Sequence, residues 1–313
     1  MFLHHRETCT DSCAPGLHKA FTFSLLAMAV HALFNPALAA DTKQTQEVMV
    51  VNANADIDAA APQDKTDYQV KTTRAGTKLL LTPRDVPQSV SVITQQRMQD
   101  QQLQTVNDVL NNTTGITSNL IDSERTYYFS RGFQLSNFTF DGIPTSVGDA
   151  GNYGDAASDT AIYDRIEVVR GATGLMTGAG SPAASVNMVR KHADSKEFTG
   201  SFDASYGSWK KQRYVADVST RLNASGSLRG RVVAGYQNQD SWLDRYNKNT
   251  KFFYGVVDAD LTENTTLSLG YDYQDADTKD PTWGGNPVFY SNGALTHYSR
   301  SLNSAADWTY YHT

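Results

Sequence analysis

The residue types that most often carry chemistry are few in this sequence and are not arranged for catalysis. Cys9 and Cys13 form a CxxxC pair, a weak metal or redox signal by itself, and the seven histidines form no ligand-like cluster. The glycine-rich run 171–180 lacks the Gly-Lys-Ser/Thr ending of a phosphate-binding loop. No nucleophile has a positioned base near it in the sequence. We therefore expect no enzyme activity, no metal site and no cofactor.

Composition excludes two further classes of protein. The formal net charge is −6, whereas nucleic-acid-binding proteins carry basic patches, so we expect no nucleic-acid partner. No run of about 18 apolar residues appears, so the sequence holds no candidate transmembrane helix. If the protein lies in a membrane, it must cross as a closed β-barrel.

One short segment could recognise a partner protein. Residues 40–66 are poor in large apolar side chains, and this composition predicts a flexible leader. Inside the leader lies a β-prone island, Glu47-Val48-Met49-Val50-Val51. Such an island is either inert or an extended peptide that adds to the sheet edge of another protein. The residues alone leave both interpretations open.

The first 39 residues are typical of a secretory signal peptide. An apolar run over 20–30 follows Arg6 and Lys19, Pro36 breaks it, and 37–39 (Ala-Leu-Ala) supplies the small residues of a cleavage site. Both cysteines would be removed with this segment. The mature chain would then have no disulfide, and packing or the membrane would stabilise it.

Residues 67–194 predict a small α+β domain. A strand is expected over 86–93, and Thr94 would cap a short helix after it. Thr105 and Asp108 have the spacing of a capping box that opens a second helix. Asp141-Gly142 indicates a turn between two extended runs, and 166–169 reads as another strand.

Residues 195–313 change to a period-two pattern typical of outer-membrane strands. About five segments alternate apolar and polar side chains, with tyrosines near the strand ends, over 202–206, 214–218, 228–236, 253–261 and 267–273. A soluble antiparallel sandwich also alternates in this way. Short turns at 223–226 and 262–264, set against longer connections on the other side, favour the barrel. We interpret Asp203, Asp217, Asp258 and Asp260 as lumen-facing residues that hydrate the interface between domain and barrel.

Five strands are too few to close a barrel, which needs at least about eight. The last residues, Tyr310-Tyr311-His312-Thr313, would lie in an extracellular loop. We therefore expect the chain to be an N-terminal fragment or a truncated reading frame.

Several motifs together resemble the TonB-dependent ferric-siderophore receptors. The resemblance runs from the leader to the last residue. The motifs that carry it are Arg84-Asp85-Val86-Pro87-Gln88-Ser89-Val90, Ser130-Arg131-Gly132-Phe133, Phe140-Asp141-Gly142-Ile143-Pro144 and Ile166-Glu167-Val168-Val169-Arg170-Gly171. The resemblance implies an α+β plug domain followed by the first strands of a transmembrane barrel of about 22 strands, in the cell outer membrane and in contact with its lipid. It also implies that residues 47–51 are a TonB box, which pairs as a strand with the energy transducer TonB.

Within the family, 170–178, 206–209 and 240–246 resemble receptors for ferric coprogen, a hydroxamate siderophore. A siderophore saturates its own iron, so the receptor needs an aromatic and polar cup instead of metal ligands. A guanidinium there can donate to hydroxamate oxygens. The siderophore-binding residues implied are Arg125, Tyr127, Asn152, Tyr153 and Trp283. Ala150-Gly151 replaces an Arg-Trp pair of the coprogen type, which puts coprogen itself in doubt.

We also expect Arg131, Glu167 and Arg170 to form ion pairs that hold the plug wall. The function that fits these observations is energised import of a ferric siderophore. The alternatives are a passive porin-like channel, an outer-membrane or secreted enzyme, and a truncated remnant that transports nothing.

Overall fold

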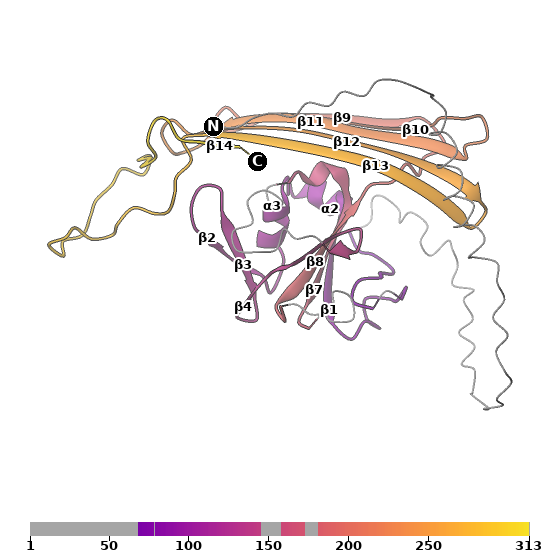
Figure 1. Ribbon diagram of the computed structural model, residues 1–313, viewed down its shortest axis with the longest axis horizontal. Helices are drawn as coiled ribbons and strands as arrows, with labels where there is room; N and C mark the ends of the chain where they lie inside the picture. The colour runs from indigo at the N-terminus through magenta and orange to yellow at the C-terminus, as the bar shows by residue number, and fades with distance from the viewer. Residues whose placement is uncertain (1–67, 78, 145–157, 173–180, 313) are drawn as a thin grey trace, which may run out of the picture. The chain divides into compact units, whose positions relative to one another are not determined.

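The computed structural model describes residues 68–77, 79–144, 158–172 and 181–312, all within one unit of the chain, Ala53–Thr313. The predicted signal peptide, the leader and the island Glu47–Val51 lie outside the described residues. Two β-rich parts follow one another in sequence: an α+β domain and a sheet of long strands beside it (Figure 1). The predicted domain boundary at 194 falls in the segment between them.

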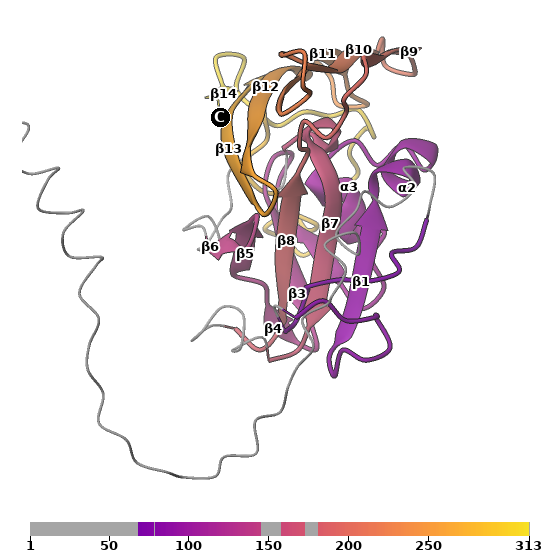
Figure 2. The same cartoon turned by 90° about the vertical axis from the view of Figure 1, so that its right-hand side faces the viewer.

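The α+β domain is built around a five-stranded sheet (Figure 2). Its order is β1 (Ser89–Thr94), β7 (Tyr163–Arg170), β8 (Ala184–Arg190), β5 (Asn137–Phe140) and β6 (Ile143–Pro144). Only the β5–β8 pair is parallel. A second sheet contains β2 (Thr117–Leu120), β3 (Thr126–Ser130) and β4 (Phe133–Gln134). The helices are α2 (Gln95–Asp100), α3 (Val106–Asn111) and the 3-10 turn η4 (Thr160–Ile162).

Local side-chain bonds start both helices, as the sequence predicts. The Arg97 amide donates to Thr94 Oγ1 at 3.4 Å and caps α2. At α3, the Asp108 amide donates to Thr105 Oγ1 at 3.1 Å, and the Thr105 amide donates back to Asp108 Oδ2 at 2.9 Å. This reciprocal pair is the expected capping box, and a cap of this kind contributes about 1 kcal/mol. No helix in the described ranges is long and apolar enough to cross a membrane.

The core of the domain lies between these helices and the sheet. Met98 of α2 and Val109 and Leu110 of α3 pack with Ile166 and Val168 of β7, all five at most 3% exposed. The Asp141-Gly142 turn joins β5 to β6 as predicted, with φ of +50° and +79°, a conformation that favours Asp and Gly. The Arg190 amide donates to Asp141 Oδ1 at 2.8 Å, which fixes the turn against β8.

The second part is an antiparallel sheet of long strands, here called the long sheet. Its order is β14 (Tyr310–His312), β13 (Thr265–Lys279), β12 (Asn247–Thr262), β11 (Leu228–Asp240), β10 (Gln212–Arg221) and β9 (Thr199–Tyr206). The five alternating segments each form one strand, so this prediction is confirmed. The prediction that residues 310–313 lie in a loop is wrong for residues 310–312, because Tyr310 pairs with Lys279.

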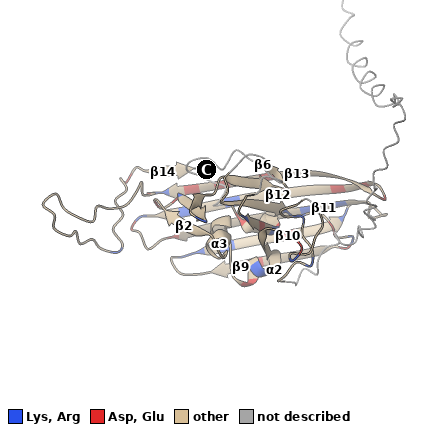
Figure 3. Cartoon of the chain, turned by 90° about the horizontal axis from the view of Figure 1, so that it is seen from below, with Lys and Arg blue, Asp and Glu red and all other residues tan. Residues whose placement is uncertain are grey.

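The two faces of the long sheet have different surroundings. The apolar members of the predicted alternation face outward: Phe202, Tyr206, Tyr214, Val218, Val232, Tyr236, Phe253, Val257, Leu261, Leu267, Leu269, Tyr271 and Tyr273. Charged residues also occur along these strands (Figure 3). The inner face is not uniformly polar, contrary to prediction, since Val215, Val233, Phe252, Tyr254 and Val256 are buried within the same apolar cluster as the α+β core. The alternation predicted which side chains share a face of the long sheet. It did not predict that the α+β domain would cover the inner face.

A glycine makes room for one of the two aromatic side chains on this inner face. Gly235 of β11 lies opposite Phe252 of β12, and a Cβ added at Gly235 would come 2.2 Å from Phe252 Cζ. Phe252 is 3% exposed and its ring also lies 5.6 Å from the Arg213 guanidinium carbon. The absence of a side chain at position 235 therefore leaves the space that the Phe252 ring occupies.

We predict that Gly235→Ala destabilises the protein by about 1–3 kcal/mol, because the phenyl ring must leave its position in a packed interior. The measurement is denaturant unfolding of the purified protein in detergent. Gly255→Ala is the matched control, since its added Cβ would meet Phe253 at an ordinary 3.5 Å. Equal stability of the two variants would contradict the prediction.

Candidate functional site

The α+β domain contacts the long sheet in two polar zones. One, here called the apex cluster, is formed by the β2–β3 turn together with β12, β13 and the connections next to them, and consists of Asp122, Ser123, Glu124, Arg125, Tyr246, Lys248, Thr278, Thr282 and Trp283. The other, here called the seam, consists of Asp159 and the segment 190–194 with the inner faces of β10 to β13. Both zones join residues that are far apart in sequence.

Arg125 lies between an acid and an aromatic ring at the apex cluster. Its guanidinium forms a salt bridge with Asp122, whose side chain is 2% exposed. The guanidinium carbon lies 4.6 Å from the centre of the Trp283 ring, within the range of a cation–π contact. Tyr311 packs edge-on to Trp283 with the ring centres 6.4 Å apart. Together they form one rim of cationic and aromatic groups.

Glu124 attaches the same turn to the long sheet. Its carboxylate accepts from Lys248 Nζ at 2.8 Å, from the Tyr246 hydroxyl at 2.7 Å and from Thr278 Oγ1 at 3.3 Å. Burial, together with the Glu124 charge, raises the pKa of Tyr246 well above its ordinary value. The tyrosine therefore stays a neutral hydrogen-bond donor throughout the physiological range.

The structure brings together only some of the residues implied by the resemblance. Arg125 and Trp283 are in contact. Tyr127 is on the neighbouring strand β3, but it lines none of the cavities described here, because Thr126 and Tyr128 point to the opposite face of the strand. Asn152 and Tyr153 lie outside the described residues.

Sequence reasoning missed the acids that hold the apex turn. Asp122 and Glu124 both precede Arg125 within four residues, and this charged run was the available signal. The partners of Glu124 are Tyr246 and Lys248, which lie 122 and 124 residues further along the chain. A pattern read along the chain gives no indication of such distant partners.

At the seam, Asp217 of β10 forms the centre of a buried ion cluster. Asp217 Oδ2 lies 2.8 Å from Lys191 Nζ and 2.7 Å from Arg231 Nη2. The Lys191 side chain is 3% exposed and that of Arg231 is 8% exposed. Burial lowers the pKa of Lys191, and the Asp217 charge opposes this effect.

The expected hydration of the lumen-facing carboxylates is therefore wrong for three of the four. Asp217 binds Lys191 and Arg231, and Asp260 accepts from Arg229 Nη2 at 2.8 Å. Asp258 accepts from the Ala193 amide at 2.6 Å. Asp217 and Asp258 are bound by groups of the connecting segment, whereas Asp260 is bound by Arg229 of the neighbouring strand β11. Asp203 remains exposed.

Backbone groups of the connecting segment are also bound to the sheet. The Tyr254 hydroxyl donates to the Lys191 carbonyl at 2.6 Å, and Arg231 Nη1 donates to the His192 carbonyl at 3.2 Å. Arg229 Nε donates to the Ala193 carbonyl at 2.8 Å. Three consecutive carbonyls are thus fixed by side chains of β11 and β12, which makes this segment a firm attachment of the domain to the sheet.

His192 adds a pH-dependent contact to this attachment. Its Nδ1 lies 3.4 Å from Asp258 Oδ1, and this hydrogen bond together with nearby carboxylate charges raises the pKa of His192 above the ordinary 6.5. A raised pKa means that the contact stabilises the fold fully below about 6.5 and that this contribution is lost as pH rises through the folded-state value.

We predict that His192→Ala lowers stability by about 0.5–1 kcal/mol near pH 6, because the ring is more than half exposed and solvent weakens the pair. The difference from the parent protein is expected to vanish near about pH 8.5, where the imidazole is neutral. Denaturant unfolding at the two pH values measures it. A difference that grew with pH would contradict the assignment.

Arg131, Glu167 and Arg170 do not form the expected ion-paired network. Glu167 instead pairs with Arg165 Nε at 2.8 Å, while Arg170 Nη2 donates to Ser89 Oγ at 2.7 Å. Positions 167 and 170 lie three residues apart on β7 and so point to opposite faces. Arg131 lies against Gly171. Burial of Arg170, together with the positive charge of Arg131, lowers the pKa of Arg170.

One group of side chains has the composition of a metal site. Asp275, Asp277 and His312 have ligand atoms within 4.8 Å of one another. His312 Nδ1 lies 2.6 Å from Asp277 Oδ1, so an ion pair between β13 and β14 accounts for the arrangement.

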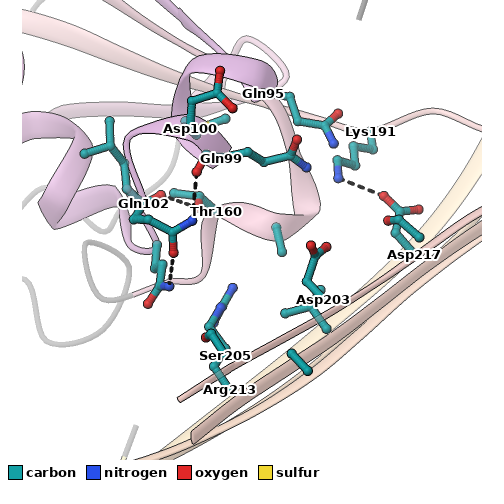
Figure 4. A pocket seen from close by; sticks show the side chains of 17 residues that line it. Gln95, Gln99, Asp100, Gln102, Thr160, Lys191, Asp203, Ser205, Arg213 and Asp217 are labelled. Carbon is teal, nitrogen blue, oxygen red and sulfur yellow. Dashed lines mark hydrogen bonds and ion pairs between the residues drawn. The ribbon is translucent and has the colours of Figure 1, made fainter. Parts of the chain in front are cut away.

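Two polar cavities lie between the α+β domain and the long sheet. The inner cavity, of about 420 Å³, is lined by α2, η4, β9 and β10, with Gln95, Gln99, Asp203 and Arg213 around it (Figure 4). The outer cavity, of about 270 Å³, is lined by α3, β3, β11 and β12 and reaches Glu124 of the apex cluster. Charged and amide side chains line both cavities, so they suit polar contents.

Comparison with known proteins decides the family. Residues 82–185 match the family model described as TonB-dependent Receptor Plug Domain. Residues 82–185 are a plug domain of the type found in TonB-dependent receptors. The α+β domain is this plug, and the long sheet after it matches the antiparallel strands of solved receptors, so the predicted fold class is confirmed.

The most informative relatives are siderophore receptors. The chain is 44% identical to the ferripyoverdine receptor of Pseudomonas aeruginosa over 79% of its own length, and 29% identical to the ferrioxamine receptor of Yersinia enterocolitica over 82%. It spans 30% and 35% of the length of these two relatives.

Solved structures agree with this assignment. The ferripyoverdine receptor of the P. aeruginosa outer membrane, bound to ferripyoverdine, superposes with a TM-score of 0.76 at 43% identity, covering 80% of this chain and 34% of that one. The alcaligin outer-membrane receptor of Bordetella pertussis gives 0.62 at 38% identity, covering 70% and 38%. Both of these solved relatives are named as receptors of the outer membrane.

Proposed function

We propose that the protein containing this plug imports a ferric siderophore across the outer membrane. The observation that carries the proposal is the apex cluster, where Arg125 and Trp283 form a cationic and aromatic rim on the side of the long sheet that bears its longest connection, 280–309. In outer-membrane barrels the longer loops face outward. A rim of this chemistry suits a wrapped iron complex that presents oxygen atoms and flat apolar edges.

Energy for import would come from TonB through the island Glu47–Val51. A strand-prone peptide in a polar leader suits pairing with the sheet edge of a partner. Cysteine substitutions at Val48 to Val51 should cross-link to TonB, and their failure to do so would remove this part of the proposal.

The ligand that we propose first is a ferric siderophore of the pyoverdine class. Relatives named as pyoverdine receptors share 37–44% of the aligned residues, whereas those named as ferrioxamine receptors share 27–29%. A hydroxamate of the coprogen type, indicated by local motifs, is the second candidate, and Ala150-Gly151 argues against coprogen itself.

The test is uptake of radioactive iron by a Gram-negative host that lacks its own siderophore receptors and expresses the intact protein. We expect TonB-dependent uptake from ferripyoverdine. Preference for ferrioxamine B or coprogen would keep the transporter and change the ligand. Uptake from none of these complexes in a correctly inserted protein would reject the proposal.

A passive channel fits less well. The plug is bound to the inner face of the long sheet through the seam and the apex cluster, which fills space that a porin keeps open. Uptake that continued in a host without TonB would favour the passive channel instead.

A further inference from the structure

The inner and outer cavities adjoin at contacts between side chains. Arg213 lines the inner cavity and Asp159 lines the outer one, and their side chains form an ion pair across the boundary. Gln104 lines both cavities, and its Oε1 accepts from Lys211 Nζ at 2.5 Å. These two contacts are here called the partition.

Each contact of the partition joins the plug to the long sheet or to the connection that precedes β10. Asp159 and Gln104 belong to the plug, whereas Arg213 begins the inner face of β10 and Lys211 precedes that strand. Arg213 Nη2 donates to Asp159 Oδ1 at 2.8 Å, and the two side chains are 10% and 4% exposed. A small displacement of the plug relative to β10 would therefore break both contacts together.

The cavities also lie in series with the apex cluster. Glu124 lines both the outer cavity and the small pocket around Arg125 and Trp283. On the far side, the inner cavity extends to Lys191 and Asp217 of the seam. A polar solute that left the apex would meet the outer cavity first, the partition second and the inner cavity third.

We propose that the partition is a gate whose opening joins the two cavities into one polar passage along β10. This inference rests on the proposed import function and adds the place where the route is closed at rest. The gate is held by charge: loss of one partner leaves the other charge buried and unpaired, which strongly favours separation. The fixed partner is Arg213, on a long paired strand, and the moving partner is Asp159 of the plug.

The test measures access to the inner cavity in the intact protein in the outer membrane. Val215→Cys provides the probe, because Val215 lines the inner cavity, is 8% exposed and lies two residues from Arg213 on the same face of β10. Cys9 and Cys13 lie in the predicted signal peptide and leave no competing thiol. A charged methanethiosulfonate reagent is added to cells of a porin-deficient host, so that it enters from the cell surface.

The gate is opened by Asp159→Asn, which leaves the buried Arg213 guanidinium without its charged partner. Asn at 159 can still accept from the Ala161 amide, so the start of η4 is kept. The matched control is Asp260→Asn, which also removes the carboxylate of an ion pair, here with Arg229, and this pair lines neither cavity.

We expect the labelling rate to rise by about tenfold or more in the gate variant and to stay unchanged in the control. Equal rates in the parent and the gate variant, or the same rise in both variants, would overturn the inference. The readout needs no siderophore and no TonB. Normal siderophore uptake together with unchanged labelling would therefore reject the gate and leave the proposed function intact.

Discussion

Replacing Asp217 by alanine is expected to weaken the attachment of the plug to the long sheet by about 3–5 kcal/mol, because it leaves two buried cations without their shared partner. Lys191 and Arg231 both bind this carboxylate at under 3 Å. Arg231 retains Asp194 at 3.9 Å, but Lys191 has no other carboxylate at salt-bridge distance in the described part of the chain. No other single carboxylate of the seam binds two cations so deeply.

The measurement combines denaturant unfolding in detergent with hydrogen exchange of the amides over 191–194. Exchange should become faster by a factor that matches the lost stability, since these amides are fixed by the same cluster. Asp260→Ala is the control: it also breaks an Asp–Arg pair, but its side chain is 33% exposed and the expected cost is about 1 kcal/mol or less. Equal effects of the two substitutions would show that the buried cluster does not hold the plug.

Replacing Arg125 by alanine is expected to lower the affinity for the proposed ferric siderophore by about 10-fold to 100-fold, the loss of a charged hydrogen-bond donor. Arg125 is the cation of the apex rim, and Trp283 and Asp122 hold its guanidinium in place. Arg125→Lys should recover only part of the affinity, since an ammonium lacks the planar fork. Trp283→Ala should weaken binding as well, because it removes both a ring of the rim and a support for the guanidinium.

Equilibrium binding of ferripyoverdine to outer-membrane vesicles that contain the intact protein measures these affinities. Tyr127→Phe is the matched control: Tyr127 is close in sequence but lines neither the apex pocket nor the outer cavity, so its affinity should equal that of the parent. Full affinity in Arg125→Ala would move the ligand away from the apex cluster. The same loss in Tyr127→Phe would mean that the whole β2–β3 turn is disturbed.

Much of the fold could be predicted because its signals are local. The Thr105–Asp108 capping box and the Asp141-Gly142 turn depend on residues at most three positions apart. The strands of the long sheet could be predicted for the same reason, since alternation with period two is a property of each strand alone. The alternation alone predicted that Phe202, Leu269 and Tyr271 lie on one face, without knowledge of which strands pair.

The functional surfaces could be predicted only in part. Arg125 and Trp283 were indicated by a family resemblance, but nothing local showed that they touch across 158 residues of sequence. The pairing of Glu167 was misjudged because nearness in sequence was taken for nearness in space, whereas β7 turns Glu167 and Arg170 to opposite faces. The inner face was predicted to be hydrated because charged residues line it. The sequence did not reveal that neighbouring strands and the segment 190–194 supply the partners of these charges.

By itself, the sequence determined which residues form strands, turns and caps, and which side chains share a face, because these depend on backbone geometry and on neighbours along the chain. Only the tertiary structure decided the partners of the charges. Asp217 with Lys191, Glu124 with Lys248 and Asp159 with Arg213 meet across 26, 124 and 54 residues. A buried charge is stable only beside a partner, and which partner reaches it depends on how the plug docks against the long sheet.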